Sequence, residues 1–209
     1  MDIKELIYFI PAILIAVSLH EFAHGYVSYK LGDPTPKATG RLSLNPFTHL
    51  DPVGTLCLLF FHFGWAKPVQ VNPYYYKDKR KGMAMVGLAG PMMNFLIAII
   101  CAFAMEIILK ITGGYAGDIT MFIFKLFQYT YTISIGLGVF NLIPFPPLDG
   151  SKIVGALLPE EKYFKYMQYE RYGQLILFGL LMTNLLDRPL DIAIKGINDI
   201  IWGIVNLII

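Results

Sequence analysis

The sequence predicts an all-α polytopic membrane protein, and three observations lead to that fold class. Of the 209 residues, 56% are hydrophobic and only 15% are charged, whereas soluble domains carry about a quarter charged residues. The apolar residues gather in long blocks, which a bilayer-spanning helix requires. Basic residues gather between alternate blocks, as they do in cytoplasmic loops. The composition therefore excludes a soluble globular fold.

Three of the apolar blocks are long enough to cross a bilayer, for which roughly 20 residues suffice. They cover about residues 6–31, 83–111 and 119–143. Two further blocks, 172–186 and 190–209, predict additional transmembrane helices towards the carboxyl end. Lys195 and Asp199 interrupt the last block, so the pattern leaves open whether that helix crosses.

A shorter apolar patch, residues 52–63, lies between the first two long blocks. Twelve residues are too few for a comfortable crossing, which favours a re-entrant or interfacial segment. The flanking stretches, 38–46 and 66–73, carry prolines at spacings that disfavour helix and suit hairpins or extended edges. We therefore expect a small membrane-associated β-hairpin or re-entrant region here.

The distribution of positive charge predicts the orientation of the chain. Twelve of the 17 basic residues lie in or at the edge of two alternate loops, eight from Lys30 to Lys81 and four from Lys152 to Arg171. Positive loops stay in the cytoplasm. We therefore expect a multi-pass protein of the cell membrane, with its amino terminus outside and both basic loops inside. This parity holds only if residues 52–63 do not cross.

The first apolar block contains a motif with metal-site spacing. His20 and His24 lie four residues apart, so on a helix both project from one face and can bind one zinc ion. Glu21 lies beside them, where it can accept a proton from a zinc-bound water. The motif also occurs by chance in soluble helices. Inside an apolar span, however, ionisable side chains cost several kcal/mol unless they are paired or bound to metal.

A catalytic zinc site needs a third protein ligand and an open fourth position. Asp149 is our leading candidate, because it follows a proline-rich turn at the end of the third long block. It also suits the alternative role of a cap for the next helix. His49 and His62 are weaker candidates, since a lone histidine is more often structural. Glu106 and Glu170 are available to a different class of membrane zinc protease, but neither lies in a matching motif.

These residues resemble the site-2 protease family of intramembrane zinc metalloproteases. Four stretches match in the family's order, over about residues 13–153: His20–His24, Gly90–Asn94, Asn141–Pro147 and Leu148–Gly150. The resemblance implies a zinc site of His20, His24 and Asp149, with Glu21 as general base. It also implies a three-helix catalytic core whose scissile site is reached within the bilayer, near the cytoplasm.

The resemblance further suggests that Asn141 and Asn94 contact the active-site region and bind substrate. The alternative for both is a hydrogen bond between helices, which polar residues commonly make in membranes. Gly90 and Pro91 fit close packing or a helix start better than substrate contact. Only about seven residues, 113–119, join the second and third long blocks, which leaves no room there for a PDZ domain.

The predicted function is that of a zinc-dependent intramembrane endopeptidase, which cleaves transmembrane substrates near the cytoplasmic side. We treat residues 1–209 as one membrane-embedded protease domain, with a catalytic core of about 6–153 and accessory helices of about 160–209. The expected partners are membrane-protein substrates, the lipid bilayer and a regulatory membrane partner, with no nucleic acid. The alternative from another class is a non-catalytic scaffold or a transporter with a structural metal site.

Overall fold

The part of the chain that the structure describes is mostly helical. This computed structural model describes residues 4–54, 57, 64–114, 117–159, 162, 166, 168 and 170–209. The longer helices are α1 (Leu6–Lys30), α4 (Lys79–Thr112), α5 (Asp118–Asn141), α6 (Asp149–Leu157), α8 (Glu170–Met182) and α9 (Asp187–Ile208). A short helix α2 (Thr35–Ala38) and two 3-10 turns, η1 (Pro46–Thr48) and η2 (Pro73–Tyr75), lie between α1 and α4. The predicted helical fold class is thereby confirmed.

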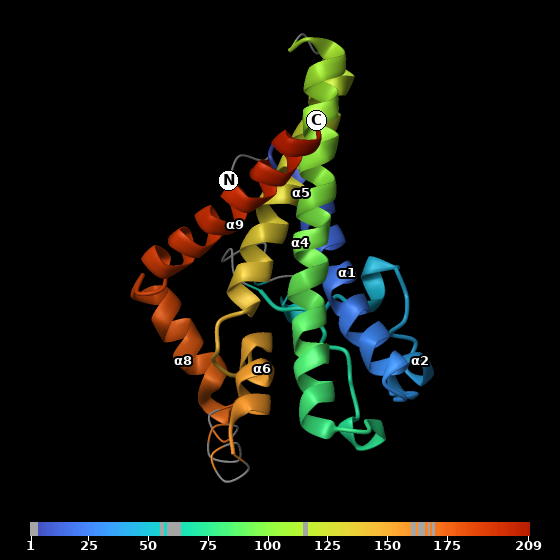
Figure 1. The fold of residues 1–209 in the computed structure, drawn as a ribbon, viewed down its shortest axis with the longest axis vertical. Helices are drawn as coiled ribbons and strands as arrows, with labels where there is room; N and C mark the ends of the chain where they lie inside the picture. The colour runs from blue at the N-terminus through green and yellow to red at the C-terminus, as the bar shows by residue number, and fades with distance from the viewer. Residues whose placement is uncertain are drawn as a thin grey trace.

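Helix α4 forms the axis of the molecule. It packs against α1, α5, α6 and α9, and α1 also packs against α5. Figure 1 shows α1 descending to α2, α4 returning upwards, and α5 descending again towards α6. Helices α1, α4 and α5 therefore form an antiparallel three-helix core, as the resemblance implies. Helix α6 and the segment before α4 lie at the same end of this core (Figure 1).

Small residues let α4 and α5 approach closely. A Cβ added to Gly138 of α5 would lie 2.6 Å from the ring of Phe95 on α4. The core continues with buried side chains from α4, α5 and α9: Ile97, Ala98, Cys101, Ala102, Met105, Tyr131, Ile135, Val139, Ile201 and Val205. Helices in lipid associate mainly through such close packing, because burial from water contributes little there.

Among the described residues, two helices are long and apolar enough to cross a membrane. They are α1, with 25 residues, and α4, with 34. Helix α5 has 24 residues and thus sufficient length, but Lys125, Gln128 and three threonines make it less apolar. Helix α8 has only 13 residues, which at 1.5 Å each span about 20 Å of a core that is about 30 Å thick. The predicted set of crossing helices is thus supported for α1 and α4.

The predicted β-hairpin is not formed by the described residues on either side of the short patch. They contain no strand, only one isolated antiparallel bridge between Leu50 and Ala66. The prolines of this region begin 3-10 turns instead, and the side chains of Asn45 and Asn72 cap η1 and η2. Proline suits the first position of a helical turn because its missing N–H needs no partner there. The patch 52–63 lies largely outside the described residues.

A buried carboxylate fastens the end of α1 to the segment before α4. Asp33 has no exposed surface and accepts hydrogen bonds from Ser28 Oγ at 2.7 Å, Thr35 N at 2.9 Å and Asn72 N at 2.7 Å. Tyr76 donates its hydroxyl to Ser28 Oγ at 2.7 Å. Burial alone raises the pKa of Asp33, but the hydrogen bonds outweigh it and hold that pKa below its usual range.

Candidate metal centre

Three ligand atoms converge where α1 meets α4 and α6. His20 and His24 project from one face of α1, and each side chain is buried. His20 Nε2 and His24 Nε2 lie 3.0 Å apart, and each lies 3.0 Å from Asp149 Oδ2. These three residues are the one group of potential metal ligands found within the described part of the chain. The structure thus brings together the three ligands expected from the sequence.

The turn between α5 and α6 carries Asp149 into this group. The chain folds back so tightly that a Cβ at Gly150 would lie 2.2 Å from the carbonyl oxygen of Leu142. Leu148 occupies the cap position of α6 without a side-chain cap, and Asp149 is the first residue of the helix. Its carboxylate contacts imidazole nitrogens rather than backbone N–H groups. The geometry therefore favours the ligand role over the capping role.

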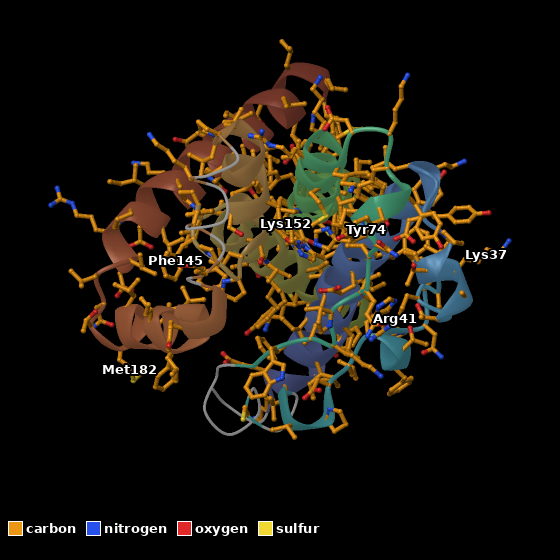
Figure 2. All side chains as sticks on the ribbon, turned by 90° about the horizontal axis from the view of Figure 1, so that it is seen from below. Lys37, Arg41, Tyr74, Phe145, Lys152 and Met182 are labelled. Atoms are coloured by element: carbon orange, nitrogen blue, oxygen red, sulfur yellow. The ribbon has the colours of Figure 1, made fainter. Side chains whose placement is uncertain are left out.

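Lys152 balances the charge of Asp149. Its Nζ lies 2.8 Å from Asp149 Oδ1, while Oδ2 faces the imidazoles. One oxygen of the carboxylate thus contacts the cation of Lys152, and the other contacts both imidazoles. Figure 2 shows Lys152 near the middle of this end of the molecule.

Helix α4 forms the wall behind both imidazoles. A Cβ at Gly90 would lie 2.5 Å from His24 Nε2 and 2.6 Å from His20 Nε2, so only glycine leaves room for the two rings. His24 Nδ1 donates to the carbonyl oxygen of Val86 at 2.6 Å. Asn94 Nδ2 lies 3.1 Å from His20 Nδ1. The close-packing role expected for Gly90 therefore fits the structure.

Glu21 is held by the extended segment that precedes η2. Its Oε2 accepts a hydrogen bond from the backbone N–H of Val69 at 3.0 Å. One turn further along α1, Gly25 lets this segment approach, because a Cβ there would lie 3.3 Å from Val69 and 3.2 Å from Leu42. Glu21 thus has a fixed backbone partner beside the two histidines.

The other candidate residues lie elsewhere. His49 Nε2 is bonded to the carbonyl oxygen of Ser43, 2.8 Å away. Asn141 donates to the carbonyl oxygen of Leu137 in its own helix at 3.0 Å. Glu106 lies on α4 twelve residues beyond Asn94, about 18 Å along the helix. His62 and the side chain of Glu170 lie outside the described residues.

Three groups that contact the candidate site were not predicted from the sequence: Lys152, the carbonyl of Val86 and the amide of Val69. Lys152 stands three residues after Asp149 in a helix, a spacing that brings side chains together. It could have been found from the sequence alone. The carbonyl of Val86 and the amide of Val69 are backbone groups, and no residue type signals them.

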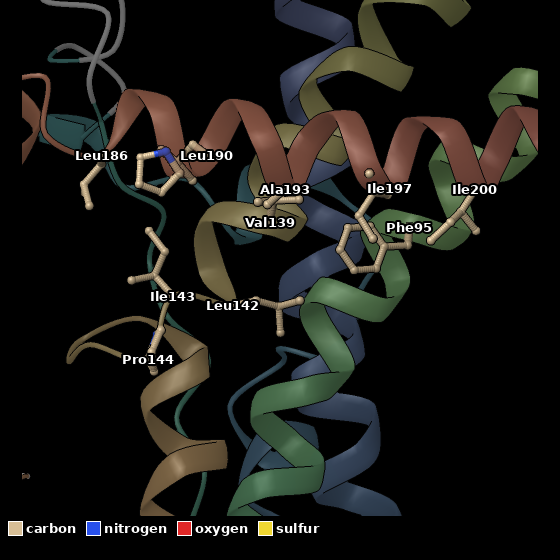
Figure 3. A pocket seen from close by; sticks show the side chains of 12 residues that line it. Phe95, Val139, Leu142, Ile143, Pro144, Leu186, Leu190, Ala193, Ile197 and Ile200 are labelled. Atoms are coloured by element: carbon tan, nitrogen blue, oxygen red, sulfur yellow. The ribbon is translucent and has the colours of Figure 1, made fainter.

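A separate apolar cavity of about 580 Å³ lies between α4, the end of α5 and α9. Figure 3 shows the side chains of α9 above it and those of Leu142, Ile143 and Pro144 below it. None of the three candidate ligands lines this cavity. It borders the turn that leads to Asp149, on a side different from the metal centre.

The chain was compared with protein families, curated proteins and solved structures. Residues 8–184 match the family described as peptidase family M50. The chain belongs to peptidase family M50. This match confirms the site-2 protease family that the sequence motifs indicate. It covers nearly all of α1 and the whole of α4, α5, α6 and α8, so it includes every residue of the candidate metal centre.

Curated relatives agree with this assignment. "Putative zinc metalloprotease YwhC" of Bacillus subtilis is 37% identical over 186 residues, which cover 85% of this chain and 81% of that protein. "Putative zinc metalloprotease Rip2" of Mycolicibacterium smegmatis is 26% identical, over 84% of this chain and 66% of the relative. "Zinc metalloprotease MJ0392" of Methanocaldococcus jannaschii is 25% identical, over 83% of this chain and 43% of that relative. The chain thus spans less than half of the archaeal relative. No solved structure gives a significant match.

Proposed function

We propose that this protein is a zinc-dependent intramembrane endopeptidase, and that residues 1–209 form one protease domain. The observation that carries the proposal is the triangle of His20 Nε2, His24 Nε2 and Asp149 Oδ2, 3.0 Å on each side. The two histidines lie on α1, which is long and apolar enough to cross a bilayer. Membership of a peptidase family and the names of the relatives, which are zinc metalloproteases, support the same activity.

The residues fit zinc by chemistry and by spacing. Two imidazoles and one carboxylate form a ligand set found in catalytic zinc sites. Ligands about 2.1 Å from zinc in a tetrahedral arrangement lie roughly 3.3 Å from one another, and the three atoms here are 3.0 Å apart. His24 is already in the ligating form, because donation from Nδ1 to Val86 leaves Nε2 unprotonated. Three protein ligands leave a fourth position for water, as catalysis requires.

Glu21 is the proposed general base. A bound zinc ion supplies a Lewis-acid centre that lowers the pKa of a bound water towards roughly 7. The carboxylate of Glu21 takes the proton of that water and delivers it to the leaving amine of the cleaved peptide. The bond from Val69 N–H to Oε2 fixes the rotamer and occupies one oxygen. We assign the proton transfer to the second carboxylate oxygen.

The site lies within the span rather than at its end. Helix α1 ends at Lys30, so His24 lies six residues and His20 ten residues before its end. At 1.5 Å per residue these distances are about 9 Å and 15 Å. The end of α1 and helix α6 lie at this same end of the core (Figure 1). Basic residues follow both helices in the sequence, and positive loops face the cytoplasm. We therefore propose a multi-pass cell-membrane protein, with its amino terminus outside and its active site towards the cytoplasm.

The proposed substrates are transmembrane segments of other proteins. A helical substrate hides its carbonyl groups in internal hydrogen bonds, so it must unwind locally before cleavage. The extended residues 41–45 and 69–72 lie beside α1 and offer backbone groups for strand addition. Asn141, at the end of α5, is the proposed donor to the substrate, exchanging its bond to Leu137 for one to a carbonyl. We also propose a regulatory partner in the membrane.

The decisive experiment compares wild-type protein with Glu21→Gln. Both forms should bind one zinc ion per chain, whereas only the wild type should cleave membrane substrates. Membrane peptides that accumulate in cells carrying Glu21→Gln then identify the substrates. Glu106→Gln is the matched control, because Glu106 lies about 18 Å along α4 from Asn94 and should leave turnover intact. Identical, zero turnover of wild type and Glu21→Gln on a panel of membrane substrates would support a scaffold or transporter with a structural metal instead.

A further inference from the structure

The amide of Asn94 lies directly behind His20 and has no exposed surface. Its Nδ2 is 3.1 Å from His20 Nδ1, on the side of the ring away from Asp149. Its Oδ1 is buried without a hydrogen-bond partner among the described residues. A buried polar atom without a partner costs roughly 1–3 kcal/mol. An orphaned oxygen beside a candidate metal ligand therefore calls for a functional explanation.

The present orientation of the amide fixes the proton of His20 on the wrong nitrogen for metal binding. Asn94 Nδ2 donates to His20 Nδ1, so in the neutral ring the proton is on Nε2. That proton points at Asp149 Oδ2, 3.0 Å away. A metal at Nε2 needs the lone pair of this nitrogen and hence the other tautomer. His24 has no such conflict, because the carbonyl of Val86 can only accept from its Nδ1.

A half turn of the Asn94 amide removes this conflict. Asparagine oxygen and nitrogen have nearly the same shape, so the turn needs no additional space. It places Oδ1 where Nδ2 now lies, about 3.1 Å from His20 Nδ1. Oδ1 then accepts from Nδ1–H, the orphaned oxygen gains its partner, and Nε2 is left unprotonated. One rotation thus pairs the orphaned oxygen and frees His20 Nε2 for a metal, and it leaves Nδ2 as the atom of the amide without a partner among the described residues.

We propose that Asn94 is the positioning residue of the metal centre: its Oδ1 accepts from His20 Nδ1–H and so presents Nε2 to zinc. This inference rests on the proposed zinc site and replaces the substrate contact suggested for Asn94 by the sequence. Metal-binding histidines generally have such an outer partner, and loss of one typically lowers metal affinity 10–100-fold. Val86 is the corresponding partner of His24.

The experiment separates an acceptor role from a packing role. Asn94→Leu keeps the size of the side chain and removes the acceptor, while Asn94→Asp keeps only acceptors. Zinc affinity of the full-length protein in nanodiscs is measured by competition with a chromophoric chelator. We expect Asn94→Leu to bind zinc 10–100-fold more weakly than wild type, and Asn94→Asp to bind within about threefold of wild type or more tightly. A packing role predicts the reverse order, since a carboxylate is the more disruptive change in an apolar bundle.

Asn198→Leu is the matched control. Asn198 lies on α9, where its Oδ1 accepts from Tyr131 at 2.6 Å, away from the ligands. It should leave zinc affinity unchanged. Asn94→Leu with wild-type zinc affinity would overturn the role of Asn94 and leave the zinc site standing. Wild-type protein that binds no zinc would overturn the zinc site itself, and this inference with it.

Discussion

A single methyl group at Gly90 tests whether the triangle of ligand atoms is the metal site. A Cβ at this position lies 2.5 Å from His24 Nε2 and 2.6 Å from His20 Nε2. Ordinary contact begins at 3.4 Å, so both rings must move by about 0.9 Å in Gly90→Ala. The rings cannot recede freely, because Val86 and Asn94 hold their far nitrogens. The ligand atoms are therefore displaced together.

We expect Gly90→Ala to lower zinc affinity strongly and the stability of the fold only slightly. A misplacement of about 1 Å in a functional group costs on the order of 100-fold, which corresponds to about 2.7 kcal/mol at 1.36 kcal/mol per tenfold. Overpacking between helices costs about 1–3 kcal/mol, but alanine is favoured over glycine within a helix by about 1 kcal/mol. The two effects on stability thus partly cancel, whereas zinc affinity has no such compensation.

The assay measures zinc affinity by chelator competition, together with thermal unfolding, on the purified full chain. Gly136→Ala is the matched control, since a Cβ at that position of α5 meets nothing within 4 Å. It should keep wild-type zinc affinity. If Gly90→Ala also bound zinc within threefold of wild type, the triangle would not be the zinc site.

Two further substitutions test the surroundings of the site. Asp33→Asn should lower the stability measured by thermal unfolding at pH 7 by roughly 1–3 kcal/mol, through loss of charged hydrogen bonds. Because the folded pKa of Asp33 is lowered, its contribution is present above the unfolded pKa of about 3.9 and is lost as pH falls through the folded value. The difference between variant and wild type should therefore shrink below about pH 4, and a constant difference would contradict this account. Val69→Pro removes the N–H that holds Glu21, so the rate of hydrolysis should fall tenfold or more while zinc affinity stays unchanged. Val69→Ala keeps the N–H and should match wild type in both measurements.

The long helices could be predicted from hydropathy, and their ends could not. The block expected from about residue 83 begins at Lys79 in α4. Asp78 accepts from the backbone N–H groups of Arg80 and Lys81, so a polar first turn extends the helix beyond its apolar part. A hydropathy pattern registers the apolar residues that face lipid or core. It does not register a capped turn in the aqueous region.

The prediction of a hairpin was wrong because Asn-Pro pairs are also compatible with 3-10 turns. The pattern predicts extended edges at prolines such as Pro46 and Pro73, whereas each follows an asparagine that caps a 3-10 turn. Asn-Pro pairs suit both structures, since proline fixes only φ. The choice between them depends on distant partners, here the hydrogen bond from Asn72 N to Asp33. A local pattern carries no information on that contact.

In the candidate site, the sequence likewise predicts the two histidines but not the surface of α4 that they contact. The spacing of the two histidines implies a shared face, and the helix provides it. What the spacing does not contain is the matching surface of α4, where Val86, Gly90 and Asn94 recur every four residues and so form one stripe. Helix α1 runs antiparallel to α4, so Val86 meets His24 at one end of the stripe and Asn94 meets His20 at the other. Gly90, between them, leaves space for both rings. This stripe of α4 is therefore complementary to the histidine motif of α1. Val86 orients His24, Asn94 orients His20, and Gly90 makes room for the two metal-binding nitrogens.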